Sequence, residues 1–192
     1  MYYWYKILTY LFYPFAQIYI YIRKVKGKED SIRYKEKLSK IIIPRSEGFL
    51  VWIHMASVGE AMSVLPLIES YIENKKVSKV LLTSITKSSG KILEKRFKKS
   101  SKIIHQFLPL DIPILTKKFL NHWRPNLSIF VDSEIWPNLI SQVKNNKIPL
   151  LLVNARITKK TFKRWMKVKN FAKSVFDNIK IAYPQNNETK VF

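Results

Sequence analysis

Glu60 is the residue of this chain best placed to do acid–base chemistry. It follows an apolar run, residues 49–54, and a turn of small residues that includes Ser57 and Gly59. A carboxylate just past the end of a parallel strand, at the start of a helix, lies where α/β proteins bind ligands. Glycine at position 59 lets the chain turn tightly and lets a ligand approach closely. A glutamate in a first helical turn also suits the helix dipole, so capping and catalysis both remain open for Glu60.

Polar side chains follow four further apolar runs in the same way. Because the carboxyl ends of parallel strands meet at one edge of a sheet, we expect these side chains to gather around a ligand. They are Thr83, Thr86, Ser88, Ser89 and Gly90 after the second run, Asp111 after the third, Asp132 and Glu134 after the fourth, and Asn154 and Arg156 after the fifth.

Each of these loops has a structural interpretation beside the functional one. The hydroxyls of residues 83–90 either cap a helix or donate to a phosphate at its N-terminus. The Gly-Lys-Ser/Thr order of a P-loop and the Gly-x-Gly-x-x-Gly pattern do not occur, so the sequence contains no nucleotide fingerprint. Asp132 and Glu134 alternate along a segment predicted to be extended, so one should face the cleft while the other caps a helix or bonds to backbone. Arg156 either orients a bound carboxylate or pairs with one of these two acids.

Strand and helix patterns alternate from residue 49 onward and predict a Rossmann-like α/β domain, with a parallel sheet covered by helices on both faces. The expected strands are continuous apolar runs, as when both faces are covered. These strands are residues 49–54, 79–83, 103–108, 127–131, 149–153 and 180–183. Helices are expected at about residues 28–39, from residue 60 to about 71, and over about 160–172. Three more follow the loops 83–90, 109–113 and 132–138 and should end near residues 99, 121 and 145.

The first 22 residues differ from the rest, because they are crowded with aromatic and aliphatic side chains and carry one charge, Lys6. The uncharged stretch 7–22 is shorter than the roughly 20 residues of a spanning helix. If the Lys6 side chain reaches the interface, the apolar segment can be counted from Tyr2, and its length is then sufficient. Basic residues follow at 23–28, which by the positive-inside rule keeps the next domain cytoplasmic. An aromatic helix packed on the domain is the alternative to an anchor, and an anchor either spans the membrane or lies in its interface. The expected division is a membrane anchor at 1–22, a basic connecting helix and linker at 23–48, and the Rossmann-like domain at 49–192.

The net charge of +22 calls for an anionic partner: nucleic acid, a membrane surface or an anionic substrate. Lysine outnumbers arginine by 28 to 7, and the lysines are dispersed over nearly every segment. Base and phosphate readers rely more on arginine, so an anionic membrane or phosphorylated lipid is favoured over nucleic acid. The absence of cysteine excludes disulfides and thiolate metal sites, and the three scattered histidines do not predict a zinc site.

Four segments of the chain, in order, read as a set of motifs. They are His54-Met-Ala-Ser-Val-Gly-Glu60, Thr83-Ser-Ile-Thr-Lys-Ser-Ser-Gly90, Asp132-Ser-Glu-Ile-Trp-Pro-Asn138 and Val153-Asn-Ala-Arg-Ile157. With residues 108–113 and the apolar N-terminus, they resemble the N-terminal half of the 3-deoxy-D-manno-octulosonic acid (Kdo) transferases, which add Kdo to the lipid A precursor. Ser-Val-Gly-Glu combined with Glu-Ile-Trp-Pro-Asn-Leu and Asn-Ala-Arg is specific to that family.

The resemblance implies the N-terminal domain of a GT-B glycosyltransferase, in which two Rossmann-like domains face a cleft. This domain would receive the acceptor, lipid IVA, and the other would hold CMP-Kdo. By the family's pattern, Glu60 is the general base that deprotonates the acceptor hydroxyl. Asp132 stands where the family usually has Glu, at a position assigned to transition-state stabilisation, and its reach is one methylene shorter. The remaining residues expected to bind the acceptor are Ser57, Gly59, Thr83, Thr86, Ser89, Gly90, Asp111, Glu134, Asn154 and Arg156.

Family members are considerably longer than this chain, so the CMP-Kdo domain is expected to be absent from it. A fragment, a split or decaying gene, and one half that needs a partner chain are all compatible with that length. The resemblance implies no metal and no cofactor beyond the donor CMP-Kdo. It implies lipid IVA, anionic inner-membrane lipid and a separate donor-domain chain as partners, no nucleic acid, and a place on the cytoplasmic face of the bacterial inner membrane. The alternative is a non-catalytic, basic, membrane-bound α/β module, or a vestigial fragment, that binds anionic lipid.

Overall fold

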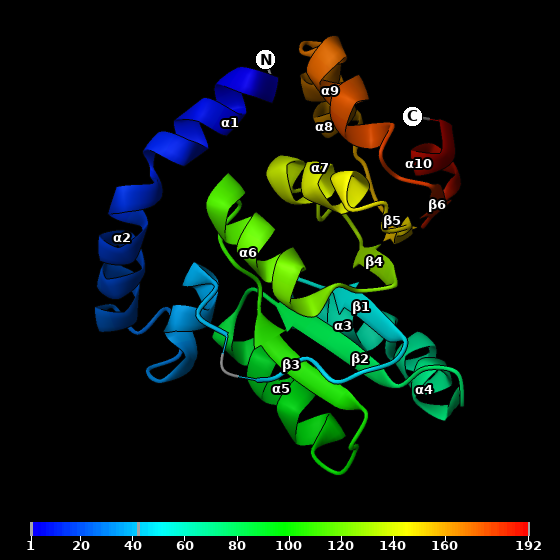
Figure 1. Ribbon diagram of the computed structural model, residues 1–192. Helices are drawn as coiled ribbons and strands as arrows, with labels where there is room; N and C mark the ends of the chain where they lie inside the picture. The colour runs from blue at the N-terminus through cyan, green and yellow to red at the C-terminus, as the bar shows by residue number, and fades with distance from the viewer. Residues whose placement is uncertain (1, 42, 192) are drawn as a thin grey trace.

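The computed structural model describes residues 2–41 and 43–191, and in them one parallel sheet lies between layers of helices (Figure 1). The strand order is β3-β2-β1-β4-β5-β6, which changes direction between β1 and β4 as in a doubly wound fold. This confirms the predicted α/β class and the parallel sheet. The strands are β1 Leu50–His54, β2 Lys79–Ser84, β3 Ile103–Phe107, β4 Leu127–Val131, β5 Leu150–Ala155 and β6 Ile181–Pro184.

Helices connect successive strands, as parallel pairing requires. The helices before β1 are α1 Tyr2–Leu11, α2 Tyr13–Val25 and the 3-10 helix η1 Arg33–Leu38. Those between strands are α3 Val58–Ser63, α4 Leu65–Glu73, α5 Lys87–Phe97, α6 Pro113–Trp123, α7 Pro137–Asn145, α8 Lys159–Met166 and α9 Lys169–Phe176, and α10 Asn187–Val191 follows β6.

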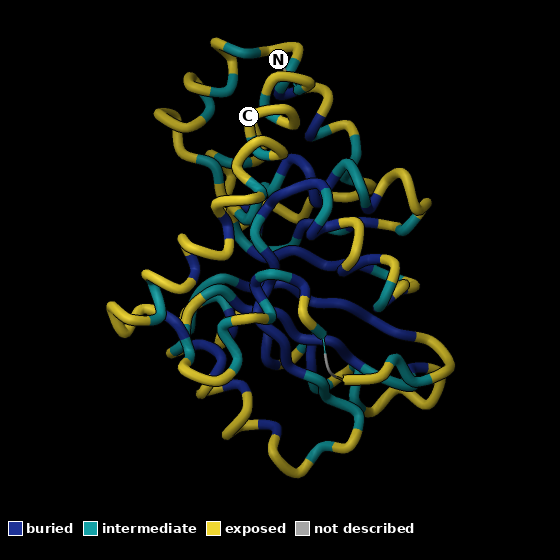
Figure 2. The backbone as a smooth tube through the Cα atoms, turned by 60° about the vertical axis from the view of Figure 1, so that its left-hand side comes forward, coloured by how far each residue is buried: buried dark blue, intermediate teal, exposed yellow. Residues whose placement is uncertain are grey.

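The core has two layers because side chains alternate across the sheet. Leu50 and Trp52 of β1 belong to the layer shared with α6, α7 and α9. Val51 and Ile53 belong to the layer shared with α3, α4 and α5. Both faces are therefore covered, which explains why the strands are continuous apolar runs. Figure 2 shows the buried backbone concentrated in the central strands.

Three predicted helices differ from those observed. The single helix expected from residue 60 to 71 is two helices, since α4 begins afresh with Pro66 in its first turn, where proline is tolerated. The helix expected over 160–172 is likewise divided into α8 and α9. Residues 28–39 contain only η1, because the Asp30 carboxylate accepts the backbone N–H groups of Ile32 and Arg33, each at 2.9 Å, and closes a turn.

The N-terminal arm, defined here as α1 and α2, lies along the domain (Figure 1). Within the described residues, no helix combines the length and the apolar character needed to cross a membrane. None of the residues of α1 is buried, and α2 buries Ala16 and Ile20. Ala16 packs against Ile112 and Leu115 of the domain. The exposed large apolar residues of the arm are Tyr3, Trp4, Ile7, Leu8, Tyr10, Leu11, Phe15, Ile18, Tyr19, Tyr21, Ile22 and Val25, with Phe12 between the helices.

Candidate functional site

Glu60 lies in the first turn of α3, directly beyond the carboxyl end of β1. Ser57 is the N-cap of α3, and its Oγ accepts the backbone N–H of Glu60 at 3.3 Å. The Glu60 carboxylate in turn accepts the Ser57 hydroxyl at 2.8 Å and the backbone N–H of Ala56 at 2.8 Å. This reciprocal arrangement is a variant of the capping box. The capping contacts hold the carboxylate half-buried at the sheet edge, so they orient it without removing it from the site.

Gly59 does not make the tight turn that the sequence analysis expected. Its φ angle lies outside the left-handed region, and it forms part of the α3 helix. A Cβ built at Gly59 would meet no atom within 4 Å. The chain's own packing therefore does not require glycine here, and the surface above α3 is open to an approaching group.

Asp132 and Glu134 both lie close enough to Glu60 to act on it electrostatically. Burial raises the pKa of the Glu60 carboxyl above its usual value, and the negative charges of Glu134 and Asp132 raise it further. The hydrogen bonds from Ala56 and Ser57 act in the opposite direction. The balance gives Glu60 a carboxylate that accepts a proton more readily than an exposed glutamate does.

The prediction that Asp132 and Glu134 alternate along an extended segment is wrong. Asp132 has a φ of +62° and begins a turn that ends β4. Aspartate tolerates this left-handed conformation better than most residues. The turn replaces the extended geometry that would have sent the two side chains to opposite faces. Asp132 and Glu134 both remain on the side of Glu60 as a consequence.

Glu134 is held by the rings of His54 and Trp136, two contacts that the sequence pattern did not predict. His54 Nε2 lies 3.1 Å from Glu134 Oε2, and Trp136 Nε1 donates to the same oxygen at 2.8 Å. His54 is fully buried at the end of β1. A histidine that ends an apolar strand and opens a family motif is the sequence signal for this contact, but neither feature predicts the partner of its ring. Thr83, predicted to bind the acceptor, is buried behind His54 and contacts its Nδ1 through Oγ1 at 3.0 Å.

The loop after β2 makes the capping contacts that were one of its two interpretations. Thr86 is the N-cap of α5 and accepts the backbone N–H of Ser89 at 3.2 Å. Ser89 Oγ donates to the Ala56 carbonyl at 3.3 Å, which joins the start of α5 to the loop that carries Glu60. Gly90 lies in the first turn of α5 on its buried side, where a Cβ would come within 2.8 Å of the Phe107 ring. Gly90 therefore serves close packing, and it does not line the edge.

Asp111 lies away from Glu60, under the start of α7. Its carboxylate accepts the backbone N–H groups of Asn138 at 3.1 Å and Leu139 at 2.8 Å, and the Tyr5 hydroxyl at 2.8 Å. Burial raises its pKa to about 6 despite these hydrogen bonds. Burial and the neighbouring Asp111 charge also raise the pKa of Tyr5. Asp111 thus caps α7 and attaches the N-terminal arm, a position that the sequence pattern did not predict.

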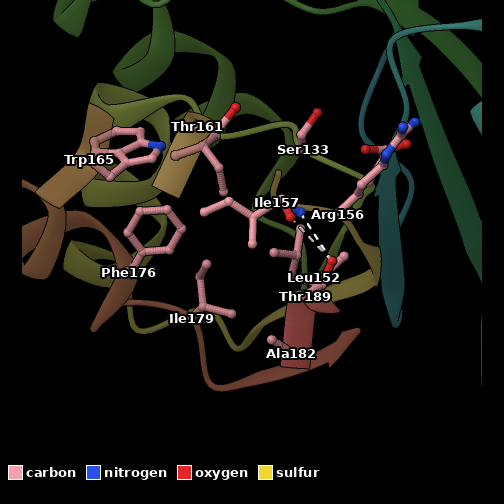
Figure 3. A pocket seen from close by; sticks show the side chains of 13 residues that line it. Ser133, Leu152, Arg156, Ile157, Thr161, Trp165, Phe176, Ile179, Ala182 and Thr189 are labelled. Atoms are coloured by element: carbon pink, nitrogen blue, oxygen red, sulfur yellow. Dashed lines mark hydrogen bonds between the residues drawn. The ribbon is translucent and has the colours of Figure 1, made fainter. Parts of the chain in front are cut away.

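A cavity of about 390 Å³ adjoins Asp132 and Arg156 and opens between α8, α9 and the ends of β5 and β6 (Figure 3). Arg156 is exposed, and within residues 2–41 and 43–191 no carboxylate forms an ion pair with it. The apolar lining includes Leu152, Ile157, Trp165, Phe176 and Ile179. The cavity thus combines an apolar wall with the exposed Arg156 guanidinium and the Asp132 carboxylate at its rim.

Asn154 is not part of this cavity. It has a φ of +53°, the second left-handed residue at the carboxyl edge of the sheet. It lines a separate depression with Val64 and Tyr183. The structure therefore gathers Ser57, Gly59, Glu60, Asp132, Glu134 and Arg156 around one edge, with Thr86 and Ser89 beside them. Asn154 lies at the same edge in its own depression, and Asp111 and Gly90 lie elsewhere.

Ser84, His105 and Glu94 form a second constellation that has the order of a nucleophilic triad. Ser84 Oγ lies 2.9 Å from His105 Nε2, and His105 Nδ1 lies 3.4 Å from Glu94. Both Ser84 and His105 are buried, and Arg33 contacts the same Nδ1 at 3.1 Å. Burial and the Arg33 charge lower the pKa of His105 to about 3, so the ring is a poor base near neutral pH. This cluster is a structural link between η1, α5 and β3.

The geometry around Glu60 suits proton abstraction from a bound hydroxyl. The carboxylate is oriented by backbone and hydroxyl donors, its pKa is raised, and the surface beside it is open. In the described part of the chain, no group of three or more histidine, aspartate or glutamate side chains is arranged to hold a metal ion. These features define a doubly wound α/β domain with an oriented, half-buried carboxylate of raised pKa at the carboxyl edge of its sheet.

Comparisons with known proteins place this domain in a family. Residues 29–191 match the family model described as 3-Deoxy-D-manno-octulosonic-acid transferase (kdotransferase). A 3-deoxy-D-manno-octulosonic acid transferase of Rickettsia bellii is 41% identical over 174 residues, which are 91% of this chain and 41% of that protein. The enzyme of the same name from Haemophilus influenzae is 29% identical over 164 residues, 82% of this chain and 38% of that protein.

The chain belongs to the Kdo transferase family, as the family model covers well over half of it. It spans about two fifths of the length of the Rickettsia bellii relative. The resemblance inferred from the four motifs is thereby confirmed.

Proposed function

We propose that this chain is the acceptor-binding half of a Kdo transferase and acts in lipopolysaccharide biosynthesis. The observation that carries the proposal is Glu60, an oriented carboxylate with a raised pKa at the ligand-binding edge of the sheet. Membership of the family supports the reaction type, transfer of Kdo to a lipid acceptor. The domain would then be the N-terminal one of a GT-B glycosyltransferase.

In this mechanism Glu60 accepts the proton of an acceptor sugar hydroxyl. The hydroxyl oxygen forms the new bond to the anomeric carbon of Kdo, and CMP leaves with the electron pair of the broken bond. A carboxyl with a raised pKa serves this step well, because the proton passes to a stronger base. Asp132 lies beside Glu60 and is assigned to the transition state. Its side chain keeps the charge of the family's usual glutamate at a shorter reach.

The acceptor would be lipid IVA, an anionic amphiphile that suits the rim of the cavity. Arg156 is exposed and free of an ion pair among the described residues, so it is available to an anionic group. Ser57, Gly59 and Thr86 lie on the Glu60 side of the same edge and would contact the sugar. Ser89 is fully buried and would support this loop from below. The basic residues of α8 add positive charge nearby, and they are Lys159, Lys160, Lys163 and Arg164.

We further propose that the N-terminal arm lies on the anionic inner membrane, with the domain on its cytoplasmic face. The exposed apolar side chains of the arm and the charge of +22 support this placement. Vesicles of phosphatidylglycerol should bind the chain more tightly than vesicles of phosphatidylcholine, and added salt should weaken the binding. Leu8→Glu should weaken binding by about 10- to 150-fold, since a buried leucine contributes about 1.5–3 kcal/mol.

Ile32→Glu is the matched control for the vesicle experiment. Ile32 is 84% exposed and lies outside the arm. Its substitution adds the same charge, so it should change binding much less than Leu8→Glu. Equal losses in the two variants would show that net charge alone governs binding, and the arm would lose its proposed role.

Transfer activity is tested with a chimera in which the residues that follow the matched segment of the Rickettsia bellii relative are fused after Phe192. The donor site is proposed to lie in that added part, so the chimera should transfer Kdo from CMP-Kdo to lipid IVA. The 192-residue chain alone should give none or very little. Robust transfer by the chain alone would contradict a separate donor site.

Glu60→Gln in the chimera tests the base, because glutamine keeps the size and one acceptor oxygen but cannot take the proton. Turnover should fall by about 10²–10⁴-fold, the range of general acid–base contributions. Glu69→Gln is the control, since Glu69 lies on α4 and pairs with Arg96 at the surface. Unchanged turnover in Glu60→Gln would reject Glu60 as the base. A folded chimera that binds anionic vesicles without transfer would favour the alternative of a non-catalytic lipid-binding module.

A further inference from the structure

A continuous line of side-chain hydrogen bonds runs through the core from β1 to the loop that carries Glu134. Trp52 Nε1 donates to Thr83 Oγ1 at 2.8 Å, and this oxygen lies 3.0 Å from His54 Nδ1. On the other side of the ring, His54 Nε2 lies 3.1 Å from Glu134 Oε2. Trp52, His54 and Thr83 are all fully buried. Such a buried network is stable only when each donor meets an acceptor.

The chemistry of the members sets the direction of these bonds. The indole of Trp52 can only donate, so Thr83 Oγ1 accepts there and keeps its own proton available for His54 Nδ1. The Glu134 carboxylate can only accept, so the bond on the other side of the ring requires a proton on Nε2. Nδ1 then carries no proton, and the neutral ring is protonated at Nε2, which donates to Glu134. The other neutral tautomer would set the lone pair of Nε2 against a carboxylate oxygen. It would place its Nδ1 proton near the Thr83 carbonyl, 3.2 Å away.

We propose that His54 is a positioning residue, whose Nε2–H tautomer is selected by Trp52 and Thr83 and whose ring holds the Glu134 carboxylate in place beside Glu60. Trp136 completes the clamp, because its indole Nε1 donates to the same oxygen at 2.8 Å. The buried line thus fixes the direction of one charge at the edge of the sheet.

The position of Glu134 matters because its charge acts on Glu60. Burial raises the pKa of Glu60, and Glu134 and Asp132 are the charged groups that raise it further. Ala56 and Ser57, on the α3 side, provide the donors that lower it. If the clamp failed, Glu134 would be free to turn away from Glu60. Its negative charge would then lie farther from Glu60, and the pKa of Glu60 would fall. The inference rests on the proposed function only where Glu60 is called the base, since the geometry and titration can be measured without transfer.

The tautomer is tested first, by nitrogen NMR of the imidazole rings in the uniformly ¹⁵N-labelled chain at neutral pH. His105→Gln and His122→Gln assign the three ring systems. The ring of His54 should carry its proton on Nε2 in the wild type and in Thr83→Ser, which keeps the hydroxyl. In Thr83→Val the proton should move to Nδ1, because that atom loses its donor and retains the backbone carbonyl as an acceptor.

The effect on Glu60 is tested by its carboxyl carbon signal, followed from pH 3 to 8 and assigned with Glu60→Gln. Thr83→Val and Glu134→Gln should each lower the Glu60 midpoint by about 0.5–1 pH unit, as expected when a neighbouring like charge is withdrawn. Thr83→Ser should restore the wild-type midpoint. Thr116→Val is the matched control, because Thr116 is equally buried and its hydroxyl donates to the carbonyls of Ile112 and Pro113 at the start of α6.

Two results would overturn the proposal. One is a wild-type His54 ring that carries its proton on Nδ1, or on both nitrogens, at neutral pH. The other is a Glu60 midpoint that stays at the wild-type value in Glu134→Gln. Glu134 is partly exposed, so this variant tests the proposal even if Thr83→Val fails to fold. Loss of Kdo transfer in the chimera with both NMR results as expected would count against the proposed function and leave the positioning role intact.

Discussion

Glu60 and Asp111 are two carboxylates with similar local chemistry and different surroundings. Each lies at the start of a helix, each accepts backbone N–H groups, and burial raises the pKa of both. Asp111 is enclosed, since the Tyr5 hydroxyl covers it from the N-terminal arm. Glu60 is half-buried and has two further acids, Asp132 and Glu134, beside it. A perturbed carboxyl therefore marks a site only where its surroundings leave room for a ligand.

Two glycines repeat this contrast between an open and a closed region. Gly59 precedes Glu60, and a Cβ there would meet open space. Gly90 lies in the first turns of α5, and a Cβ there would collide with the rings of Phe107 and His105. The same residue type thus leaves a surface accessible in one loop and permits close helix packing in the other.

Asp111→Asn should have the largest effect on the free energy of unfolding among the substitutions that compare the enclosed region around Asp111 with the open region around Glu60. The carboxyl has a pKa of about 6 in the folded chain and an ordinary value of 3.8. The folded state holds its proton more tightly, so this group favours folding most below pH about 4, and the contribution is lost as pH rises through about 6. The difference corresponds to about 3 kcal/mol at most.

Urea unfolding from pH 4 to 7 measures this effect as the difference between wild type and Asp111→Asn. The other titrating groups are common to both proteins and cancel. The free energy of unfolding of the wild type should fall relative to the variant across the interval and then stay level. A difference that is constant with pH would contradict the enclosed character of Asp111.

Gly90→Ala and Gly59→Ala should give smaller effects of opposite sign. Gly90→Ala should lower the free energy of unfolding by about 1–3 kcal/mol, since the added methyl overpacks the contact with Phe107. Gly59→Ala should leave stability unchanged or raise it by up to about 1 kcal/mol, as alanine favours the helix. Thermal or urea unfolding measures both effects, and each variant is the control for the other. A comparable loss in Gly59→Ala would show that this turn is closed after all.

The sequence predicted the strands closely and the conformation of the loops poorly. An apolar run of about the length of a strand predicted each strand, because a strand covered on both faces must be apolar on both sides. The extended conformation predicted at Asp132 is wrong. Aspartate and asparagine tolerate the left-handed conformation, but their presence at positions 132 and 154 does not by itself predict it. The role of His54 was missed for a related reason. Its partners, Thr83 and Glu134, lie 29 and 80 residues away in the chain.

The sequence by itself determined the order of the elements, the family, and the identity of Glu60 as the candidate base. Local sequence patterns and motif spacing carry that information, and they can be interpreted without knowing how the chain packs. Only the tertiary structure decided which polar residues share an edge: it enclosed Asp111 beneath α7, brought Asp132 and Glu134 to Glu60, and left Arg156 exposed beside a cavity. The physical reason is that burial, tautomer and pKa depend on neighbours supplied by distant strands, which the linear pattern does not specify.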